Sequence, residues 1–265
     1  MSSTFAAHDA EAYERLMGRW SRRLAPQLIR FGGISDGDRV LDVGCGTGSL
    51  AFALPETASV GAVTGIDFAQ VYVDHAAARG TDPRFNFRQG DATALPFEDA
   101  SFDRAFCMLV LQFVPNAPKA VAEMRRVVRA GGTVTAAVWD NFGGMPHFRL
   151  LWSTAAVLFP DAVPPRQMFR RLDVQGEMAA LWRELGLHDV EQTNLLIRMD
   201  FENFEDYWQP LTRRDGPPGQ FINSLTPDEQ ERLREHVRSG YIANRADGPR
   251  SFAAVAWACR GTVPG

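Results

Sequence analysis

The sequence predicts an α/β fold in which a mostly parallel seven-stranded sheet carries helices on both faces and a helical cover follows the fifth strand. Between residues 39 and 140, short apolar runs alternate with segments of helical periodicity. The first of these runs leads into a glycine-rich turn, and the next two end in aspartates. Strands that alternate with helices in this way form parallel sheets that are covered on both faces.

Apolar residues at helical spacing, from Tyr13 to Leu28, predict an amphipathic helix near the start of the chain. Asp9 precedes this pattern, and aspartate is one of the residue types that favour the N-cap position. Gly32 and Gly33 follow the pattern and should end the helix.

Five apolar runs in the first half of the chain have the length of strands. They lie at residues 40–43, 62–67, 85–88, 102–109 and 133–139. Helices are expected between them: one that begins over residues 49–54, one over 69–79, and one from Asn116 to the glycine pair at 131–132. Pro118 supports the last of these, because the missing N–H of proline costs nothing in the first turn of a helix.

After residue 140 this alternation gives way to glycines, prolines and bulky apolar residues. Residues 1–140 are therefore expected to form a ligand-binding core with an N-terminal helix. Residues 141–187 are expected to form a helical cover, with helices at about 147–159 and 174–186.

Residues 188–265 should supply the last two strands of the sheet, at 190–201 and 251–259. A polar helical segment, at about 202–250, separates them. Its clearest helix follows Thr226, a residue type that caps helices.

The composition is that of an ordinary globular protein, with 265 residues, 45% of them hydrophobic, and a net charge of -4. No basic block interleaved with aromatic residues is present, so no nucleic-acid partner is expected. The three cysteines are widely separated and form neither a disulfide framework nor a metal-binding pattern. The sequence has no apolar run long enough to span a membrane and no signal-peptide layout at its N-terminus, so we expect a cytoplasmic protein.

The strongest functional signal is a turn with glycines at alternate positions, Gly44, Gly46 and Gly48, directly after the first strand. Glycine permits positive φ and lets a ligand approach the backbone closely. Asp67 closes the second strand about twenty residues later, where a carboxylate can accept hydrogen bonds from ribose hydroxyls. Asp91 closes the third strand, where a carboxylate can meet an adenine amino group. The three features together predict a nucleoside-containing ligand at the carboxyl edge of the sheet.

These residues carry a family resemblance. The sequence Leu-Asp-Val-Gly-Cys-Gly-Thr-Gly at 41–48 resembles the first motif of class I methyltransferases that depend on S-adenosylmethionine (SAM). Other segments are similar to the type 11 branch of that family, which includes ubiquinone and menaquinone biosynthesis enzymes; they lie at residues 90–92, 95–97, 101–103, 109–113 and 123–132. The resemblance covers about residues 10–140 and implies a Rossmann-like fold, SAM as the cofactor and a small-molecule methyl acceptor.

The resemblance also implies roles for the residues of the first motif. Asp42 would order the glycine turn. Gly44, Cys45, Gly46 and Gly48 would surround the methionine part of SAM.

Further roles are implied at the ends of the second and third strands. Asp67 would hold the ribose, and Phe68 would pack on the adenine ring. Asp91 and Ala92 would face the edge of the adenine.

At the end of the fourth strand, the resemblance places Cys107 and Met108 under the cofactor. The early segment is similar to N-terminal helices that cover the cofactor in this family. Tyr13, Arg19 or Trp20 would therefore reach SAM, unless they only pack in the core.

The sulfonium of SAM is already an activated methyl donor, so the protein must mainly hold the acceptor in line and exclude water. Many relatives have histidine where this chain has Gln112, and glutamine cannot act as a base. His147 is therefore the candidate for a catalytic base, against a structural role. Phe148 and Trp152 are candidates for contact with the acceptor, because the expected cover is rich in aromatic residues. This richness favours an acceptor that is largely apolar or aromatic.

Three other functions remain open. A nicotinamide dehydrogenase would need a glycine at position 49, where this chain has Ser49. A nucleic-acid methyltransferase would have an Asn/Asp-Pro-Pro-aromatic motif after the fourth strand, and residues 107–110 lack it. A protein that binds SAM without turnover is not excluded by any residue. Asp140 and Asn141 resemble a metal site only faintly, and we expect no metal. The acceptor, the methylated atom and the oligomeric state stay open.

Overall fold

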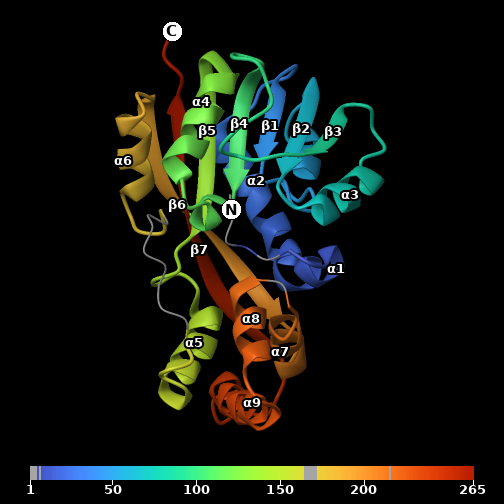
Figure 1. Ribbon diagram of the computed structural model, residues 1–265, viewed down its shortest axis with the longest axis vertical. Coiled ribbons are helices and arrows are strands. Elements are labelled where there is room, and N and C mark those ends of the chain that lie inside the picture. Colours follow the sequence, from blue (N-terminus) through green and yellow to red (C-terminus); the bar gives the residue numbers. More distant parts are fainter. Residues whose placement is uncertain (1–4, 6, 164–171, 215) are drawn as a thin grey trace.

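The computed structural model describes residues 5, 7–163, 172–214 and 216–265, and these residues form a seven-stranded sheet in the order β3-β2-β1-β4-β5-β7-β6 (Figure 1). Its strands are β1 (Arg39–Val43), β2 (Ala62–Asp67), β3 (Phe85–Gln89), β4 (Phe102–Met108), β5 (Val128–Trp139), β6 (His188–Phe201) and β7 (Arg250–Thr262). β7 runs antiparallel to both of its neighbours, and the other pairs are parallel. The predicted mostly parallel, seven-stranded Rossmann-like fold is confirmed.

Helices cover both faces of the sheet. The helical segments of the described residues are α1 (Ala10–Tyr13), η1 (Glu14–Gly18), α2 (Arg19–Gly32), η2 (Ala51–Glu56), α3 (Gln70–Arg79), η3 (Leu111–Phe113), α4 (Ala117–Val127), α5 (Pro146–Leu158), α6 (Glu177–Glu184), α7 (Phe204–Leu211), α8 (Gly216–Ser224) and α9 (Pro227–Ile242). Buried residues of α2 join the apolar core on one face. Buried residues of α4 and α6 join the core on the other face.

The expected N-terminal helix is continuous from α1 through η1 to α2, with its middle turn widened into a π-helix. The Asp9 carboxylate accepts hydrogen bonds from the backbone N–H groups of Glu11 and Ala12 and so caps the start. Gly33 ends the helix with a φ of 68°. Both predicted ends are confirmed, whereas apolar spacing gave no sign of the π-helical turn.

Two local expectations were wrong. The glycine pair at 131–132 does not end α4, which stops at Val127; the pair instead lies in an irregular start of β5, where the register against β4 shifts. Gly131 has a φ of 74°, and a side chain at Gly132 would collide with the backbone of β4. The helix expected to begin over residues 49–54 is only a short 3₁₀ helix, η2, of six residues.

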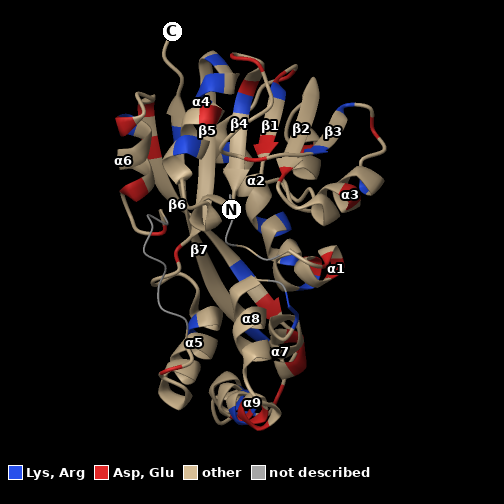
Figure 2. Ribbon diagram, viewed as in Figure 1, with Lys and Arg blue, Asp and Glu red and all other residues tan. Residues whose placement is uncertain are grey.

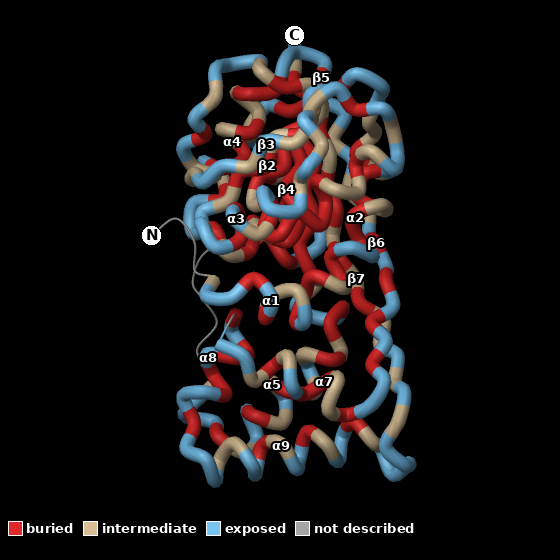
Figure 3. Tube along the Cα trace, turned by 90° about the vertical axis from the view of Figure 1, so that its right-hand side faces the viewer, coloured by how far each residue is buried: buried red, intermediate tan, exposed pale blue. Residues whose placement is uncertain are grey.

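β6 and β7 are longer than the strands beside them and extend beyond the sheet (Figure 1). At that end α5, α7, α8 and α9 pack against one another, and we call this group the lower lobe. Figure 3 shows the sheet above, the lower lobe below, and α1 between them. The expected cap of α9 is present as a capping box, in which Thr226 and Glu229 bond each other's backbone N–H.

The second helix of the expected cover is present as α6, but it lies elsewhere in the fold than expected. α6 does not join the lower lobe but packs on the sheet, where Trp182 donates its indole N–H to the backbone oxygen of Val134 at 3.0 Å. Met178, Leu181 and Trp182 are buried there, so the apolar face of α6 is buried against the sheet. Residues 164–171 of the expected cover lie outside the described residues.

Candidate active site

The glycine turn leaves the carboxyl end of β1 in a tight loop. The backbone N–H groups of Gly44 and Cys45 both donate to the backbone oxygen of Ile66, at 2.7 and 3.0 Å, which binds the turn to the end of β2. All three alternate glycines have positive φ. A side chain at Gly44 would also collide with Val110, so this position requires glycine for two independent reasons.

Asp67, at the end of β2, holds the same turn from the side. One of its oxygens, Oδ2, accepts from the N–H of Gly46 at 2.9 Å, and the other, Oδ1, accepts from the N–H of Ala69 at 2.8 Å. Burial raises the pKa of Asp67, while these N–H donors oppose the rise. A carboxylate offers about four lone-pair directions, so acceptor capacity remains for further donors.

Asp42 lies under the turn and is fully buried. Its Oδ2 accepts from the N–H of Ala51 at 3.2 Å, so it holds the start of η2 against β1. Burial raises the pKa of Asp42 to about 7.

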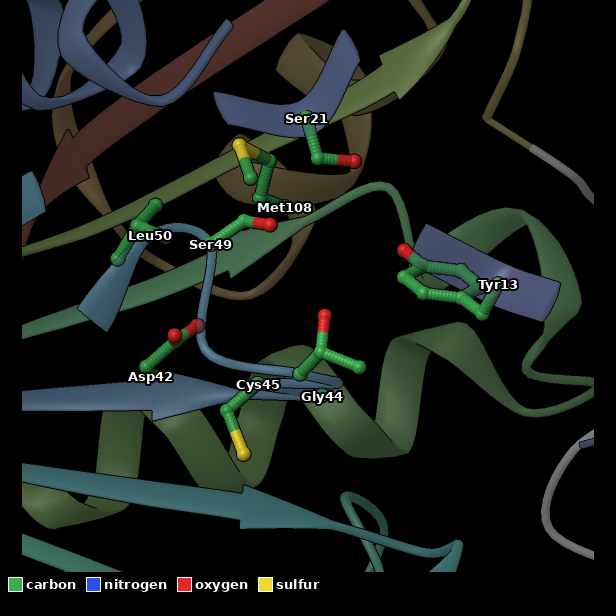
Figure 4. Close-up of a pocket in the computed structure, with 9 residues that line it drawn as sticks. Tyr13, Ser21, Asp42, Gly44, Cys45, Ser49, Leu50 and Met108 are labelled. Atoms are coloured by element: carbon green, nitrogen blue, oxygen red, sulfur yellow. The ribbon is translucent and has the colours of Figure 1, made fainter. Parts of the chain in front are cut away.

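A small polar cavity of about 10 Å³, room for a single water, adjoins Asp42. Figure 4 shows the hydroxyls of Tyr13 and Ser49 directed toward this space, with Ser21 of α2 above it. Cys45 and Met108 also line it. The cavity therefore separates the N-terminal helix from the back of the glycine turn.

A second cavity, of about 1010 Å³, lies between the carboxyl edge of the sheet and the lower lobe. Its volume is at the upper end of the range for ligand pockets, which gives room for a nucleoside cofactor and an acceptor together. On the sheet side its wall is partly polar: Gly46, Asp67 and Asp91 line it next to Phe68, which is 54% exposed. Asp91 also accepts from the N–H and the hydroxyl of Thr93, both at 2.8 Å.

On the side of the lower lobe the wall is mostly apolar. Phe148 and Trp152 of α5 face the cavity together with Phe221 of α8, and the rings of Trp152 and Phe221 lie 5.3 Å apart. Arg149 lines the same wall, where its guanidinium donates to the backbone oxygen of Phe142 at 2.9 Å. One side of the cavity is thus suited to a nucleoside and the other to an apolar ring or chain.

Most residues singled out from the sequence meet at these two cavities. Those that line the large cavity are Gly44, Gly46, Asp67, Phe68, Asp91, Ala92, Gln112, Phe148 and Trp152. Those that line the small cavity are Asp42, Gly44, Cys45 and Met108. Gly48 lines neither; it has a φ of 90°, and a side chain there would collide with Phe52. Cys107 also lines neither, because it points into the apolar core on the other face of the sheet.

The candidate base, His147, is not on the cavity wall. Its ring packs against Phe148 with centroids 4.3 Å apart, and it also neighbours Phe201 and Phe252. Burial, with a smaller contribution from the charge of Arg19, lowers the pKa of His147 to about 3. Successive residues of a helix point about 100° apart, so the face that turns Phe148 to the cavity turns His147 to the core.

Of the three residues expected to reach the cofactor from the N-terminal helix, Tyr13 alone lines a cavity. Trp20 is buried against Phe201, and Arg19 pairs with Asp206. Arg19 and Trp20 instead pack at the contact between α2 and the lower lobe, which is the alternative that the sequence left open.

Sequence reasoning missed the part of the wall that α8 supplies. Pro217, Pro218 and Phe221 line the cavity from this helix. Its sequence, Gly-Pro-Pro-Gly followed by mixed residues, has the composition of a loop rather than a helix. Leu16 and Met17 of the N-terminal helix were likewise read only as core residues, since spacing does not distinguish a core from a cavity wall.

In the described part of the chain, no group of three or more His, Cys, Asp or Glu side chains is arranged to hold a metal ion. Asn141 instead donates to Asp173 at 3.4 Å. No helix within the described ranges has the length and apolar character needed to cross a membrane.

Known proteins that are similar to this chain are methyltransferases. A family model described as a methyltransferase domain matches residues 41–136. The chain is 37% identical over 182 residues to a demethylmenaquinone methyltransferase of Staphylococcus aureus, which covers 68% of this chain and 71% of that protein. It is 40% identical over 112 residues to a ubiquinone/menaquinone biosynthesis C-methyltransferase of Bdellovibrio bacteriovorus, covering 41% of this chain and 47% of that protein, so it spans about half the length of this relative.

Among solved structures, a methyltransferase of Haloferax volcanii in complex with the Trm112 methyltransferase activator superposes with a TM-score of 0.61 at 20% identity. The superposition covers 98% of this chain and 100% of that one. At this level of identity the likeness concerns the fold.

Proposed function

This chain belongs to the class I SAM-dependent methyltransferases, in the type 11 branch, and on that premise we propose that it transfers the methyl group of SAM to a small, largely apolar or aromatic molecule. The single observation that carries the proposal is the two-sided cavity. Its polar side is built from the family's cofactor motif, and its apolar side comes from α5 and α8.

The residues of the polar side fit a nucleoside cofactor. A Cβ added to Gly46 would meet only the ring of Tyr13, at 3.9 Å, so the turn leaves open space where a ligand must approach the backbone. Asp67 has acceptor capacity for ribose hydroxyls, the exposed Phe68 would pack on adenine, and Asp91 with Ala92 would face the adenine edge. When bound, SAM supplies an electrophilic methyl group on a sulfonium.

The remaining task of the protein is to orient the acceptor and to exclude water. Phe148, Trp152 and Phe221 would hold an apolar acceptor by burial of its surface. Gln112 of η3 is buried and lines the cavity from the side of the sheet, and its amide can orient a polar group of the acceptor but cannot take a proton from it. No histidine is among the described residues that line the cavity, so the proposal requires an acceptor atom that is nucleophilic without a histidine base.

The test is formation of S-adenosylhomocysteine from SAM by the purified protein with a panel of acceptors. The panel should contain phenols, aromatic amines and reduced quinones, with demethylmenaquinone included because the staphylococcal relative is named for it. Polar acceptors such as amino acids serve as the matched negative set. Turnover only with the polar set would refute the apolar acceptor, and SAM binding without turnover on any acceptor would favour a non-catalytic SAM-binding protein.

A nucleic-acid acceptor has less support. Figure 2 shows basic and acidic residues interspersed on the described elements of both the sheet and the lower lobe. Arg149 is the one arginine or lysine among the described residues of the cavity wall. Binding of nucleic acid depends on many phosphate contacts from basic side chains, and this cavity offers few.

A further inference from the structure

The glycine turn is held by three side chains that come from other parts of the chain. Asp67, at the end of β2, accepts from the N–H of Gly46. Arg79, at the end of α3, donates to the backbone oxygen of Thr47 at 3.0 Å. Glu14 of the N-terminal helix accepts from the hydroxyl of Thr47. Asp67 and Arg79 end β2 and α3, elements of the sheet and its covering helices, whereas Glu14 belongs to the N-terminal helix, which packs over the turn from outside.

Glu14 has two partners, and one of them is buried. Its Oε1 accepts from Thr47, which is 1% exposed, and its Oε2 accepts from Arg22, whose side chain is 46% exposed. The carboxylate therefore bridges a buried hydroxyl of the glycine turn and a guanidinium at the surface. A hydrogen bond from a hydroxyl to a charged carboxylate is stronger than one between neutral groups.

The backbone around Glu14 is arranged to make room for this carboxylate. Glu14 is the first residue of the π-helical turn, and Gly18 is the last. A Cβ added to Gly18 would lie 2.5 Å from the carboxyl carbon of Glu14. Gly18 has helical dihedral angles, φ -54° and ψ -43°, so its backbone does not require glycine. What requires glycine there is the position of the Glu14 carboxylate.

The same helical turn builds part of the cavity wall. Tyr13 lines both cavities, and Leu16 and Met17 line the large one. These residues flank Glu14 in the chain, so the contact between Glu14 and Thr47 sets how far this wall stands from the glycine turn. π-helical turns occur often at functional sites, because they redirect side chains that an α-helix would place elsewhere.

We propose that Glu14 is a positioning residue for cofactor binding, which latches the N-terminal helix to Thr47 of the glycine turn. The latch closes the wall formed by Tyr13 and Met17 on the cofactor part of the cavity. This inference rests on the proposed function, since it assigns to Glu14 a part in the binding of SAM.

The first experiment measures S-adenosylhomocysteine affinity by calorimetry for the wild type, Glu14→Ala and Thr47→Val. Each variant removes one side of the latch, and each should raise Kd roughly tenfold, the order expected for one charge-assisted hydrogen bond. Thr47→Ser keeps the hydroxyl and should stay within about twofold of the wild type. Glu11→Ala, an exposed glutamate on the same helix, is the matched control and should leave Kd unchanged.

The second experiment uses Gly18→Ala, which displaces the carboxylate without removing either partner. It should raise Kd about as much as Glu14→Ala does. In the Glu14→Ala background the added methyl no longer meets a carboxylate, so Gly18→Ala should have no further effect. A double variant that binds S-adenosylhomocysteine more weakly than either single variant would contradict the latch.

Unfolding by urea without ligand, followed in parallel, separates the latch from a merely structural role. A structural role would lower the free energy of unfolding of Glu14→Ala and Thr47→Val and leave Kd of the folded protein unchanged; that result overturns the proposal. The acceptor KM, measured at saturating SAM, should hold in every variant. Failure of the proposed function is distinct, because the wild type itself would then bind no S-adenosylhomocysteine.

Discussion

The guanidinium of Arg19 donates to the carboxylate of Asp206 at 2.7 Å and to the backbone oxygen of the same residue at 3.1 Å. These contacts join the start of α2 to α7, two helices that are 187 residues apart in the chain. The guanidinium also lies over the ring of Trp20, at 4.3 Å from its centroid. The N-terminal helix is thus held to the lower lobe by Arg19 and to the glycine turn by Glu14, so it connects the two sides of the large cavity.

We predict that Arg19→Met and Asp206→Asn each lower the free energy of unfolding, with a coupling energy of about 1 kcal/mol in a double-mutant cycle. Both side chains are about a quarter exposed, so the pair is less screened than a surface pair. The exposed pair Arg15 and Glu11 is the control, for which the coupling should be near zero. Urea unfolding of the variants measures both cycles. Equal coupling in the two pairs would show that partial burial adds nothing to the Arg19 contact.

Asp67→Ala should weaken S-adenosylhomocysteine binding by about 1.5–3 kcal/mol, the order of a lost charge-assisted hydrogen bond. Part of this loss would come from the turn itself, because Asp67 also holds the N–H of Gly46. Calorimetric titration measures the change, and Asp74→Ala, an exposed aspartate on α3, is the control. Tight NAD binding by the wild type without SAM binding would contradict the family's cofactor.

Replacement of Phe148 and Trp152 by alanine should change the acceptor KM or the turnover while SAM affinity holds. Both side chains line the lower-lobe wall of the cavity, away from the glycine turn. Val157→Ala, at an 81% exposed position on the same helix, should change neither. Steady-state kinetics for the acceptor and calorimetry for the cofactor separate the two effects. Equal loss of both would mean that α5 supports the whole site rather than the acceptor part.

His147→Phe should lower turnover less than about tenfold, below the usual loss for a general acid–base residue. It should also change how stability depends on pH. The folded protein holds the imidazole neutral down to about pH 3, while the unfolded chain takes up a proton near 6.5. The stability that neutral His147 contributes is therefore complete above pH 6.5 and is lost as the pH falls toward 3, at about 1.4 kcal/mol per pH unit.

The contribution of Asp42 to the pH dependence of stability has the opposite sign. Its raised pKa makes the folded state hold a proton between about pH 7 and 3.8, where the unfolded chain does not, so this contribution grows as the pH falls. The measurement must therefore compare the slope of the unfolding free energy against pH in the wild type with the slope in His147→Phe. Urea unfolding from pH 7 to pH 5 should show the smaller loss of stability in the variant. Identical slopes would mean that His147 takes up its proton in the folded protein at the same pH as in the unfolded chain.

Features that depend only on neighbouring residues could be predicted from the amino-acid sequence. The N-cap at Asp9, the C-terminal glycine at 33, the cap at Thr226 and the alternate glycines of the turn are all local, and the structure has them where the pattern predicts them. The strands of the first half were equally visible, since a strand buried on both faces is a short apolar run between turns.

Tertiary structure decided which group each side chain meets. Glu14 was an unremarked polar position in an amphipathic helix until the fold placed it against Thr47, 33 residues later. The sequence placed both His147 and Phe148 near the acceptor, yet packing turned His147 to the core and Phe148 to the cavity. The apolar face of α6 went to the sheet rather than to the lower lobe. For the two apolar cases, hydrophobic periodicity reports that a face is buried, and burial is non-directional, so the partner is chosen only when distant segments pack. For Glu14, the hydrogen-bond partner is equally distant in the chain and is set by the same packing.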